Sequence, residues 1–283
     1  MAYEVIFEND NGMSFTFGPR GGNWFGMNIG NGLEVTLGKS QGFAQVGETV
    51  ETKAIGGRAI DVTGMLFGNI VQGKNNLRNV CAPLASGRLV FQGTHYIKVH
   101  VKASPSFSAV KNNGLFKMQF YAPFPFFSQL NESYQLIGGM TPGFSFPVNY
   151  ATPHRFGIRS TERYVNVYNS GDVRIPYRMV LRAEGTSTNP TITNITTFEY
   201  IKLNGSINAG QYITVYRDDS NVLRAELTEG NDVTDVISRI DDGSSLFELE
   251  AGDNLLAAND DEGGASLVAS FTFNPAVGAL YET

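Results

Sequence analysis

The chain has 283 residues, of which 42% are hydrophobic and 12% aromatic, so it can build one large or two medium cores and intrinsic disorder is not the default. Its formal net charge is −6, and no Lys/Arg cluster suits a phosphate backbone, so nucleic acid is not expected as a primary partner. A single cysteine, Cys81, excludes an internal disulfide framework and cannot alone complete a thiolate metal site.

The charge is divided unevenly along the chain. Residues 1–130 carry 11 Lys/Arg and 7 Asp/Glu, a net charge of +4, whereas residues 131–283 carry 10 and 20, a net charge of −10. The N-terminal residues lack the basic leader and apolar core of a secretory peptide, and no apolar run approaches the roughly 18 residues of a membrane helix. We therefore expect two units with different neighbours, synthesis in a cytoplasm and no membrane span.

The first half of the chain is predicted to contain several short strands and one helix. Asn11-Gly12 between two apolar runs predicts a hairpin, and residues 32–38 and 58–68 predict further strands. The polar stretch 39–57 has little periodicity and predicts a long loop or an extended arm. A helix is predicted over 73–84, capped by Asn75 or Asn76, ended by Pro83 and with Cys81 in its apolar stripe.

A second hairpin and a further strand follow the helix. In the second strand of this hairpin, Ile97, Val99 and Val101 face one way and the intervening Lys and His residues face the other. Residues 112–123 predict one more strand, which leads directly into the segment FYAPFPFFSQ (120–129).

This aromatic segment predicts an interface. Pro123 and Pro125 end the strand pairing, because proline lacks the N–H that a sheet ladder needs. Phe124, Phe126 and Phe127 then need cover from a second domain, a neighbouring subunit or both, since bare aromatic side chains seldom lie on an open surface. We expect these three residues to form a domain or subunit interface.

The composition changes after this segment. Residues 137–157 are rich in Gly and Pro and contain no Asp or Glu, which indicates a linker or an irregular crossover. Strand signals at roughly ten-residue spacing then continue to the end and favour an antiparallel sandwich. The predicted domains are therefore an N-terminal β domain (1–130), a linker or crossover (131–157) and a C-terminal β-sandwich (158–283).

No stretch of the sequence carries a catalytic, metal-binding or cofactor-binding motif. The three histidines, His95, His100 and His154, have no nearby metal-ligand spacing and are read as solvated. The segment 229–262 holds 11 acidic residues and one basic residue, Arg239, and acids in turns between strands normally face water. The alternatives are a carboxylate pair of a glycosidase, or a calcium site that gathers Asp218, Asp219, Asp260 and Asp261.

Aromatic residues offer one further alternative, a sugar-binding groove. Trp24 lies in the first domain, whereas Tyr164, Tyr168 and Tyr177 lie in the second, and the sequence does not bring them together. Aromatic residues at strand spacing are more often part of a core, which is the interpretation adopted here.

The order of these signals resembles the distal tail proteins (Dit) of long-tailed bacteriophages, also described as siphovirus tail components. The similar pieces are GLEV, GRAIDVTGML, a helix in NNLRNVCAPLASGRL, KASPSF, FKMQFYAPFPFF, VYNSGDVRIPYRMVLRAEGTSTNPTITN, GQYITVYRDD and SSLFELEAGDNLL followed by FTFNP. Together they span nearly the whole chain. The chain departs from the family pattern at two turns, where Glu250-Ala251-Gly252-Asp253 replaces Pro-Gly-Asn and Arg217-Asp218-Asp219 replaces an Asp-Thr pair.

The resemblance implies a mainly β fold with an N-terminal β-sandwich-like ring (belt) domain and a C-terminal galectin-like sandwich. It implies a structural virion protein and no enzyme: a homo-hexameric ring that joins the tail tube protein to the tail-tip or tail-associated protein and to receptor-binding proteins. The protein is then expected at the tip of the phage tail, with DNA only passing through the lumen of the ring. The alternative function is a carbohydrate-binding module in host cell-wall recognition, and no cofactor is expected in either case.

Overall fold

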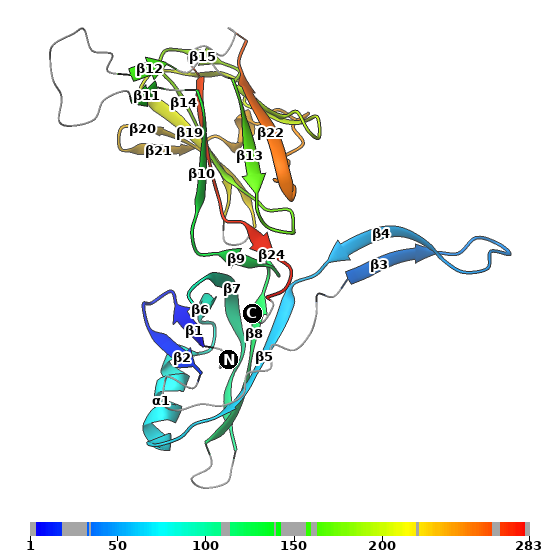
Figure 1. Cartoon of the computed structure of the whole chain (residues 1–283), viewed down its shortest axis with the longest axis vertical. Helices are drawn as coiled ribbons and strands as arrows, with labels where there is room; N and C mark the ends of the chain where they lie inside the picture. Colours follow the sequence, from blue (N-terminus) through cyan, green and yellow to red (C-terminus); the bar gives the residue numbers. More distant parts are fainter. Residues whose placement is uncertain are drawn as a thin grey trace. The chain divides into compact units, whose positions relative to one another are not determined.

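The computed structural model describes residues 4–18, 33, 35–108, 114–138, 140–142, 157–159, 163–218, 221–261 and 267–280. The chain forms two compact units, one of Met1–Leu130 with Val277–Thr283 and one of Asn131–Ala276. Within the described residues both units are built of antiparallel strands, with one α-helix and one 3-10 turn (Figure 1). The predicted mainly β fold with a short helix in the first half is confirmed.

The first unit is organised around one large antiparallel sheet with the order β2-β1-β6-β7-β8-β5; β9 also pairs with β7, and β24 pairs with β9. The strands are β1 (Val5–Asn9), β2 (Ser14–Phe17), β5 (Arg58–Met65), β6 (Ser86–Phe91), β7 (His95–Phe107), β8 (Leu115–Ala122), β9 (Phe127–Gln129) and β24 (Ala276–Val277). The predicted Asn11-Gly12 turn joins β1 to β2, and Gly12 has a φ of 78°, which glycine adopts without strain.

The core of this unit lies on one face of the sheet. Ile97, Val99 and Val101 point into it from β7, as the alternation of the sequence predicts, while Lys98 and His100 stay exposed. Phenylalanine rings fill much of the remaining volume of this core, as the 4.8 Å between the ring centroids of Phe7 and Phe120 illustrates. Because the side chains of this core are apolar, hydrophobic burial is its main source of stability.

Helix α1 (Ile70–Val80) covers part of this core with Leu77 and Val80. It begins three residues before the predicted start, because Asn69 and not Asn75 or Asn76 is the cap: its side chain accepts a hydrogen bond from the N–H of Gln72 at 3.1 Å. The helix ends at Val80, ahead of Pro83, and Cys81 is fully buried beside it, as predicted.

A separate two-stranded sheet begins in the predicted strand 32–38 and extends into the stretch 39–57, which was predicted as a long loop or an extended arm. It consists of β3 (Val35–Ser40) and β4 (Thr49–Ile55), which pair with each other and are absent from the large sheet (Figure 1). We call residues 35–55 the arm.

The second unit contains a six-stranded sheet, β10-β23-β14-β19-β20-β21, and a four-stranded sheet, β13-β22-β16-β17. The six strands are β10 (Ser133–Ile137), β14 (Arg178–Ala183), β19 (Gln211–Arg217), β20 (Leu223–Glu229), β21 (Asp232–Asp235) and β23 (Leu267–Phe273). The four are β13 (Tyr164–Asn169), β16 (Thr191–Asn194), β17 (Glu199–Lys202) and β22 (Gly252–Asn259). Shorter elements are β11 (Met140–Pro142), β12 (Gly157–Arg159), β15 (Ser187–Thr188), β18 (Ser206–Ile207) and the 3-10 turn η2 (Ile237–Arg239).

The two units differ from the predicted domains at two places. Residues 133–137, predicted as linker, form β10 and pair with β23 at the edge of the six-stranded sheet. Polar and apolar residues alternate over Ser133–Leu136, as in a strand, but the apolar members Tyr134 and Leu136 are exposed. Val277–Thr283, predicted as part of the second domain, belong to the first unit, because Val277 and Leu280 pack against its core. Most of the predicted linker, residues 143–156, lies outside the described residues.

Candidate functional site

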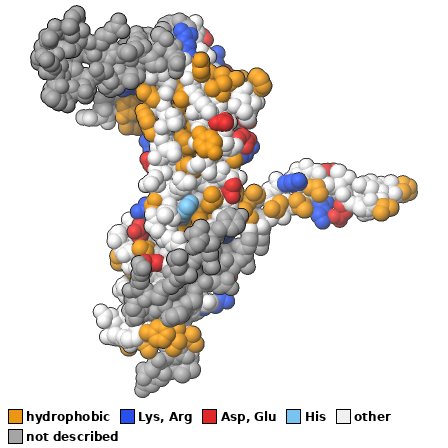
Figure 2. Space-filling view, viewed as in Figure 1, with side chains coloured by type: hydrophobic (Ala, Val, Ile, Leu, Met, Phe, Trp, Pro, Cys, Tyr) orange, Lys and Arg blue, Asp and Glu red, His pale blue; other side chains and the backbone are white. Residues whose placement is uncertain are grey.

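The arm exposes several apolar side chains in the described part of the first unit. Every residue of β4 is exposed, and β3 is exposed at all positions except the half-buried Gly38. A two-stranded hairpin without a core is marginally stable by itself, so its length is not explained by the stability of its own unit. Figure 2 shows hydrophobic side chains along the arm and at its tip, mixed with charged ones.

The tip of the arm is an ordered turn that presents two bare apolar side chains. Gln45 organises it: its Oε1 accepts from the N–H of Gly42 at 2.9 Å, and its Nε2 donates to Thr49 Oγ1 at 2.9 Å. Phe43 and Val46 beside it are 106% and 102% exposed. Because large apolar side chains seldom stand fully exposed without a binding role, the tip is a candidate contact surface.

Further along the arm, one face carries an apolar stripe. Val35 lies opposite Ile55 in the ladder, and Leu37 lies two residues further along the same face. All three are between 41% and 52% exposed. Lys39 and Glu48 form an exposed ion pair at 2.8 Å near the tip, which contributes little free energy by itself. The arm therefore offers apolar side chains at its base and tip, and two strand edges for pairing.

The three phenylalanines predicted as an interface occupy two different environments. Phe127 lies in the core of the first unit, with its ring 5.2 Å from that of Phe91 in an edge-to-face arrangement. Phe124 and Phe126 pair with each other edge to face at 5.1 Å and are half-buried. Pro125 between them is buried. Phe127 is thus a core residue of its own unit, and the interface role of the three stays a prediction.

Arg58 connects Phe127 to the returning end of the chain. Its guanidinium lies 4.6 Å from the centre of the Phe127 ring and donates to the carbonyl oxygen of Gly278 at 2.6 Å. The side chain is buried, which lowers the pKa of Arg58, and its Nε has no hydrogen-bond partner. Through these two contacts Arg58 links Gly278 to the core of the first unit.

Two of the four residues named for the calcium alternative accept hydrogen bonds from side chains far away in the sequence. Asp260 Oδ2 accepts from Ser187 Oγ at 2.6 Å, and Asp261 Oδ2 accepts from the amide of Asn189 at 2.6 Å. In the part of the chain that the structure describes, no three His, Cys, Asp or Glu side chains are grouped to hold a metal ion. Asp219, from the calcium alternative, and His154 lie outside the described residues.

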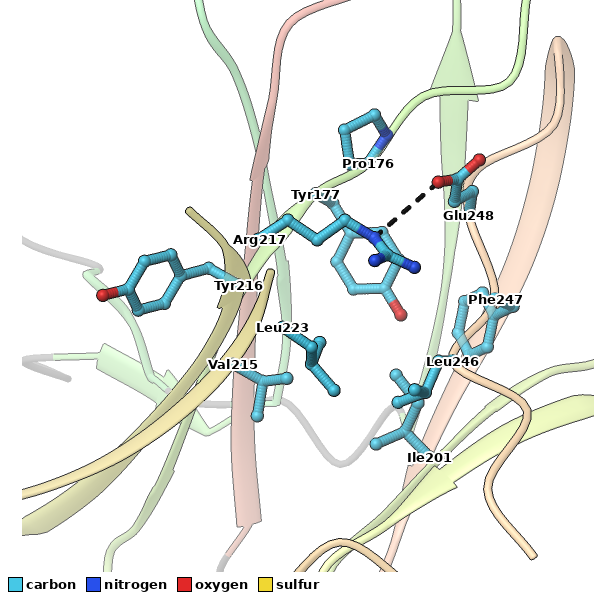
Figure 3. Close-up of a pocket in the computed structure, with 10 residues that line it drawn as sticks. All are labelled: Pro176, Tyr177, Ile201, Val215, Tyr216, Arg217, Leu223, Leu246, Phe247 and Glu248. Carbon is cyan, nitrogen blue, oxygen red and sulfur yellow. Dashed lines mark ion pairs between the residues drawn. The ribbon is translucent and has the colours of Figure 1, made fainter. Parts of the chain in front are cut away.

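A pocket in the second unit is too small for an organic ligand. Its cavity of about 20 Å³ has room for a water molecule, and Tyr177, Phe247 and Leu246 are among its walls (Figure 3). Arg217 and Glu248 form an ion pair across it at 3.8 Å. The hydroxyl group of Tyr177 is buried without a hydrogen-bond partner, and burial raises the pKa of Tyr177 strongly. Tyr177 is therefore a packing residue of the sandwich.

The three tyrosines singled out as sugar candidates are separated in the structure. Tyr164 and Tyr168 are 58% and 60% exposed on β13, whereas Tyr177 packs against Phe247 and Phe271 at 5.4 and 5.7 Å between ring centroids. Trp24 lies outside the described residues. The preference for a core position is thus right for Tyr177 and wrong for the two tyrosines of β13.

The sequence predicted a long loop or an extended arm at 39–57, and its apolar tip was missed. The available signal was the placement of Phe43 and Val46 within a Gly- and Gln-rich turn, where neither a strand face nor a helix face could bury them.

Among the described residues, no helix has the length and hydrophobicity needed to cross a bilayer.

Comparison with solved structures identifies the fold. The crystal structure of the Dit protein (gp 19.1) of SPP1, described as a paradigm of the hub adsorption apparatus of phages that infect Gram-positive bacteria, matches with a TM-score of 0.65 and 12% identity. The match covers 95% of this chain and 98% of that chain. No protein-family model and no curated protein matches the sequence. The chain has the fold of a phage Dit hub protein, as its sequence resemblance implies.

Two chains from the baseplate of phage P2 in its activated conformation also match. The structure with Ca has a TM-score of 0.48 and 12% identity, with 99% of each chain covered. The structure with Sr has a TM-score of 0.45 and 13% identity, with 96% of this chain and 97% of that chain covered.

Proposed function

We propose that this protein is the distal tail hub of a long-tailed phage, a structural protein of the virion that acts by geometry and docking and not by catalysis. The observation that carries this proposal is the match to the SPP1 Dit fold over nearly the whole of both chains, in which neither unit is missing and no large domain is added. This is an analogy from fold, which alone does not fix function. It supports a shared architectural role because a hub acts through surfaces that the whole chain presents.

The hub is a ring of six copies that joins the tail tube protein above to the tail-tip or tail-associated protein below, with receptor-binding proteins attached. A closed ring requires a heterologous contact, in which one surface of each copy meets a different surface of the next. The arm suits such a contact, because Phe43 and Val46 at its tip are bare and its strand edges are unpaired in the two-stranded sheet. DNA passes through the ring without specific binding.

Electron microscopy and light-scattering mass over a concentration series test this function. The purified protein should form six-fold rings, and the F43S/V46S variant should remain monomeric, because it loses the two apolar side chains at the arm tip. The variant V222S/V233S is a matched control, since it removes two exposed valines from the second unit and should still form rings. A wild-type protein that stays monomeric at every concentration, or rings formed equally well by F43S/V46S, would count against the proposal.

The aromatic segment is proposed as a second contact of the hub, between the two units or between neighbouring copies. Phe124 and Phe126 are the members available for it, since Phe127 is committed to the core of the first unit. Phe126→Ser should weaken ring assembly or domain docking without unfolding the first unit, as measured by particle counts in micrographs and by thermal melting. Phe198→Ser, at an exposed phenylalanine of the second unit, is the control. If F126S forms as many rings as the wild type and melts at the same temperature, the interface role is excluded.

A further inference from the structure

The outer face of the four-stranded sheet in the second unit has a composition unlike the rest of that unit. The ladder registers place eleven side chains on it: Tyr164, Asn166 and Tyr168 from β13; Asp253, Leu255, Ala257 and Asn259 from β22; Thr191 and Thr193 from β16; Tyr200 and Lys202 from β17. We call this set the tyrosine face. Its two charged members, Asp253 and Lys202, are of opposite sign, although residues 131–283 carry a net charge of −10.

Two aromatic rings stand on this face at the spacing of an extended strand. Tyr164 and Tyr168 are four residues apart on β13, which places them about 13 Å apart on one side of the sheet. Both are more than half exposed, and neither ring packs against another ring in the described structure. Tyrosine combines an apolar ring with a polar tip, so it can stack on the C–H face of a sugar while its hydroxyl group hydrogen-bonds at the edge.

A pair of polar side chains lies beside these rings: Asn166 stands between the two tyrosines on β13, and Asp253 lies opposite Tyr168 on β22. Asn166 Nδ2 donates to Asp253 Oδ1 at 2.7 Å across the β13–β22 ladder, and both side chains are exposed. This bond restrains both side chains, and each retains a second oxygen, Asn166 Oδ1 and Asp253 Oδ2, that can accept a hydrogen bond. Restrained acceptors beside two aromatic rings match the hydroxyl groups of a sugar chain that lies along the strand.

We propose that the tyrosine face binds a neutral oligosaccharide, with Tyr164 and Tyr168 stacking on separate sugar rings and the Asn166–Asp253 pair accepting hydrogen bonds from hydroxyl groups between them. The near balance of charge on the face argues against a strongly ionic partner. A protein partner is disfavoured because the apolar groups exposed on the face are the two separate rings of Tyr164 and Tyr168 and the half-buried Leu255, set among hydroxyl and amide groups without a broad apolar centre. The proposal does not depend on ring formation.

The test uses the full-length protein and a panel of neutral tetrasaccharides based on glucose, N-acetylglucosamine and galactose, measured by saturation-transfer difference NMR and isothermal titration calorimetry. At least one tetrasaccharide should bind with a millimolar to micromolar Kd, and a sulfated tetrasaccharide should not. Y164A and Y168A should each weaken binding about tenfold, and the double variant should abolish it. Asp253→Asn should weaken binding less, because it keeps an acceptor oxygen.

Tyr134→Ala is the matched control, because Tyr134 is 60% exposed, as Tyr168 is, but lies on β10 of the other sheet. Binding that is lost in Y164A/Y168A and kept in Y134A supports the proposal. Absence of binding to the whole panel, or equal loss in Y134A, overturns it. Loss of ring formation in Y164A/Y168A also overturns it, because the face is then a contact between copies. Rings that persist without sugar binding leave the hub function intact and refute this site alone.

Discussion

Cys81 shows how burial controls a side chain's chemistry. It is fully buried at the end of α1, and desolvation raises the pKa of its thiol to about 12. At neutral pH the thiolate that reacts with disulfide reagents is therefore almost absent in the folded protein. Cys81 is a packing residue, as its place in the helical stripe predicted.

The raised pKa of Cys81 predicts a loss of stability at alkaline pH. The thiol ionises near pH 8.5 in the unfolded chain and near pH 12 in the folded one, so the unfolded state binds fewer protons between these values and stability falls as pH rises. Cys81→Ala should lose less stability than the wild type between pH 8 and pH 10.5, measured by urea unfolding. Equal pH slopes for the two proteins would contradict the burial argument.

The buried hydrogen bond of Arg58 is expected to stabilise the fold more than an exposed ion pair does. Arg58→Ala removes the bond to Gly278 and the stacking on Phe127, and should lower the free energy of unfolding by about 1.5–3 kcal/mol. The control Arg88→Ala removes an exposed ion pair with Glu8 at 2.7 Å and should cost at most about 1 kcal/mol. Faster proteolysis of the C-terminal residues is expected for Arg58→Ala only. A smaller loss for Arg58→Ala than for Arg88→Ala would rule out the linking role.

At the scale of elements, the tip of the arm is expected to contribute to ring assembly and not to the stability of the folded chain. Ser40 pairs directly with Thr49, so the eight residues between them can be replaced by Asn-Gly, a two-residue turn that suits a hairpin. The thermal midpoint should stay within about 1 °C of the wild type, because all eight residues are exposed. Ring formation should be lost, since Phe43 and Val46 are removed. A large drop in the thermal midpoint, measured by circular dichroism, would show that the tip packs on its own unit.

At the scale of the whole molecule, the two units differ in how the chain builds them. The second is one continuous stretch, Asn131–Ala276, whereas the first combines Met1–Leu130 with Val277–Thr283. The fragment 131–276 should therefore fold alone and melt cooperatively. The fragment 1–130 should be less stable than the same fragment with the peptide 277–283 added, because Val277 and Leu280 pack on its core. Equal thermal midpoints with and without the peptide would contradict this assignment.

Local patterns in the sequence were enough to predict strand faces and tight turns. Alternation placed Ile97, Val99 and Val101 in the core, and Asn11-Gly12 predicted a hairpin, because strand faces and tight turns follow from the backbone itself. The start of α1 was misplaced because two further asparagines, within the helix, offer the same capping chemistry as Asn69. The order of weak motifs along the chain also pointed to the fold that the comparison with the SPP1 Dit structure shows.

Contacts between residues far apart in sequence required the tertiary structure. Whether Phe127 lies in a core or at a joint depends on Phe91 and Arg58, which no local pattern links to it. The same holds for the Asn166–Asp253 pair, 87 residues apart, and for the return of Val277 to the first unit. The sequence by itself determined the β-rich class and the strand faces, because these depend on short-range geometry. The tertiary structure decided which aromatic residues are buried and which are bare, because burial depends on what the rest of the chain brings against them.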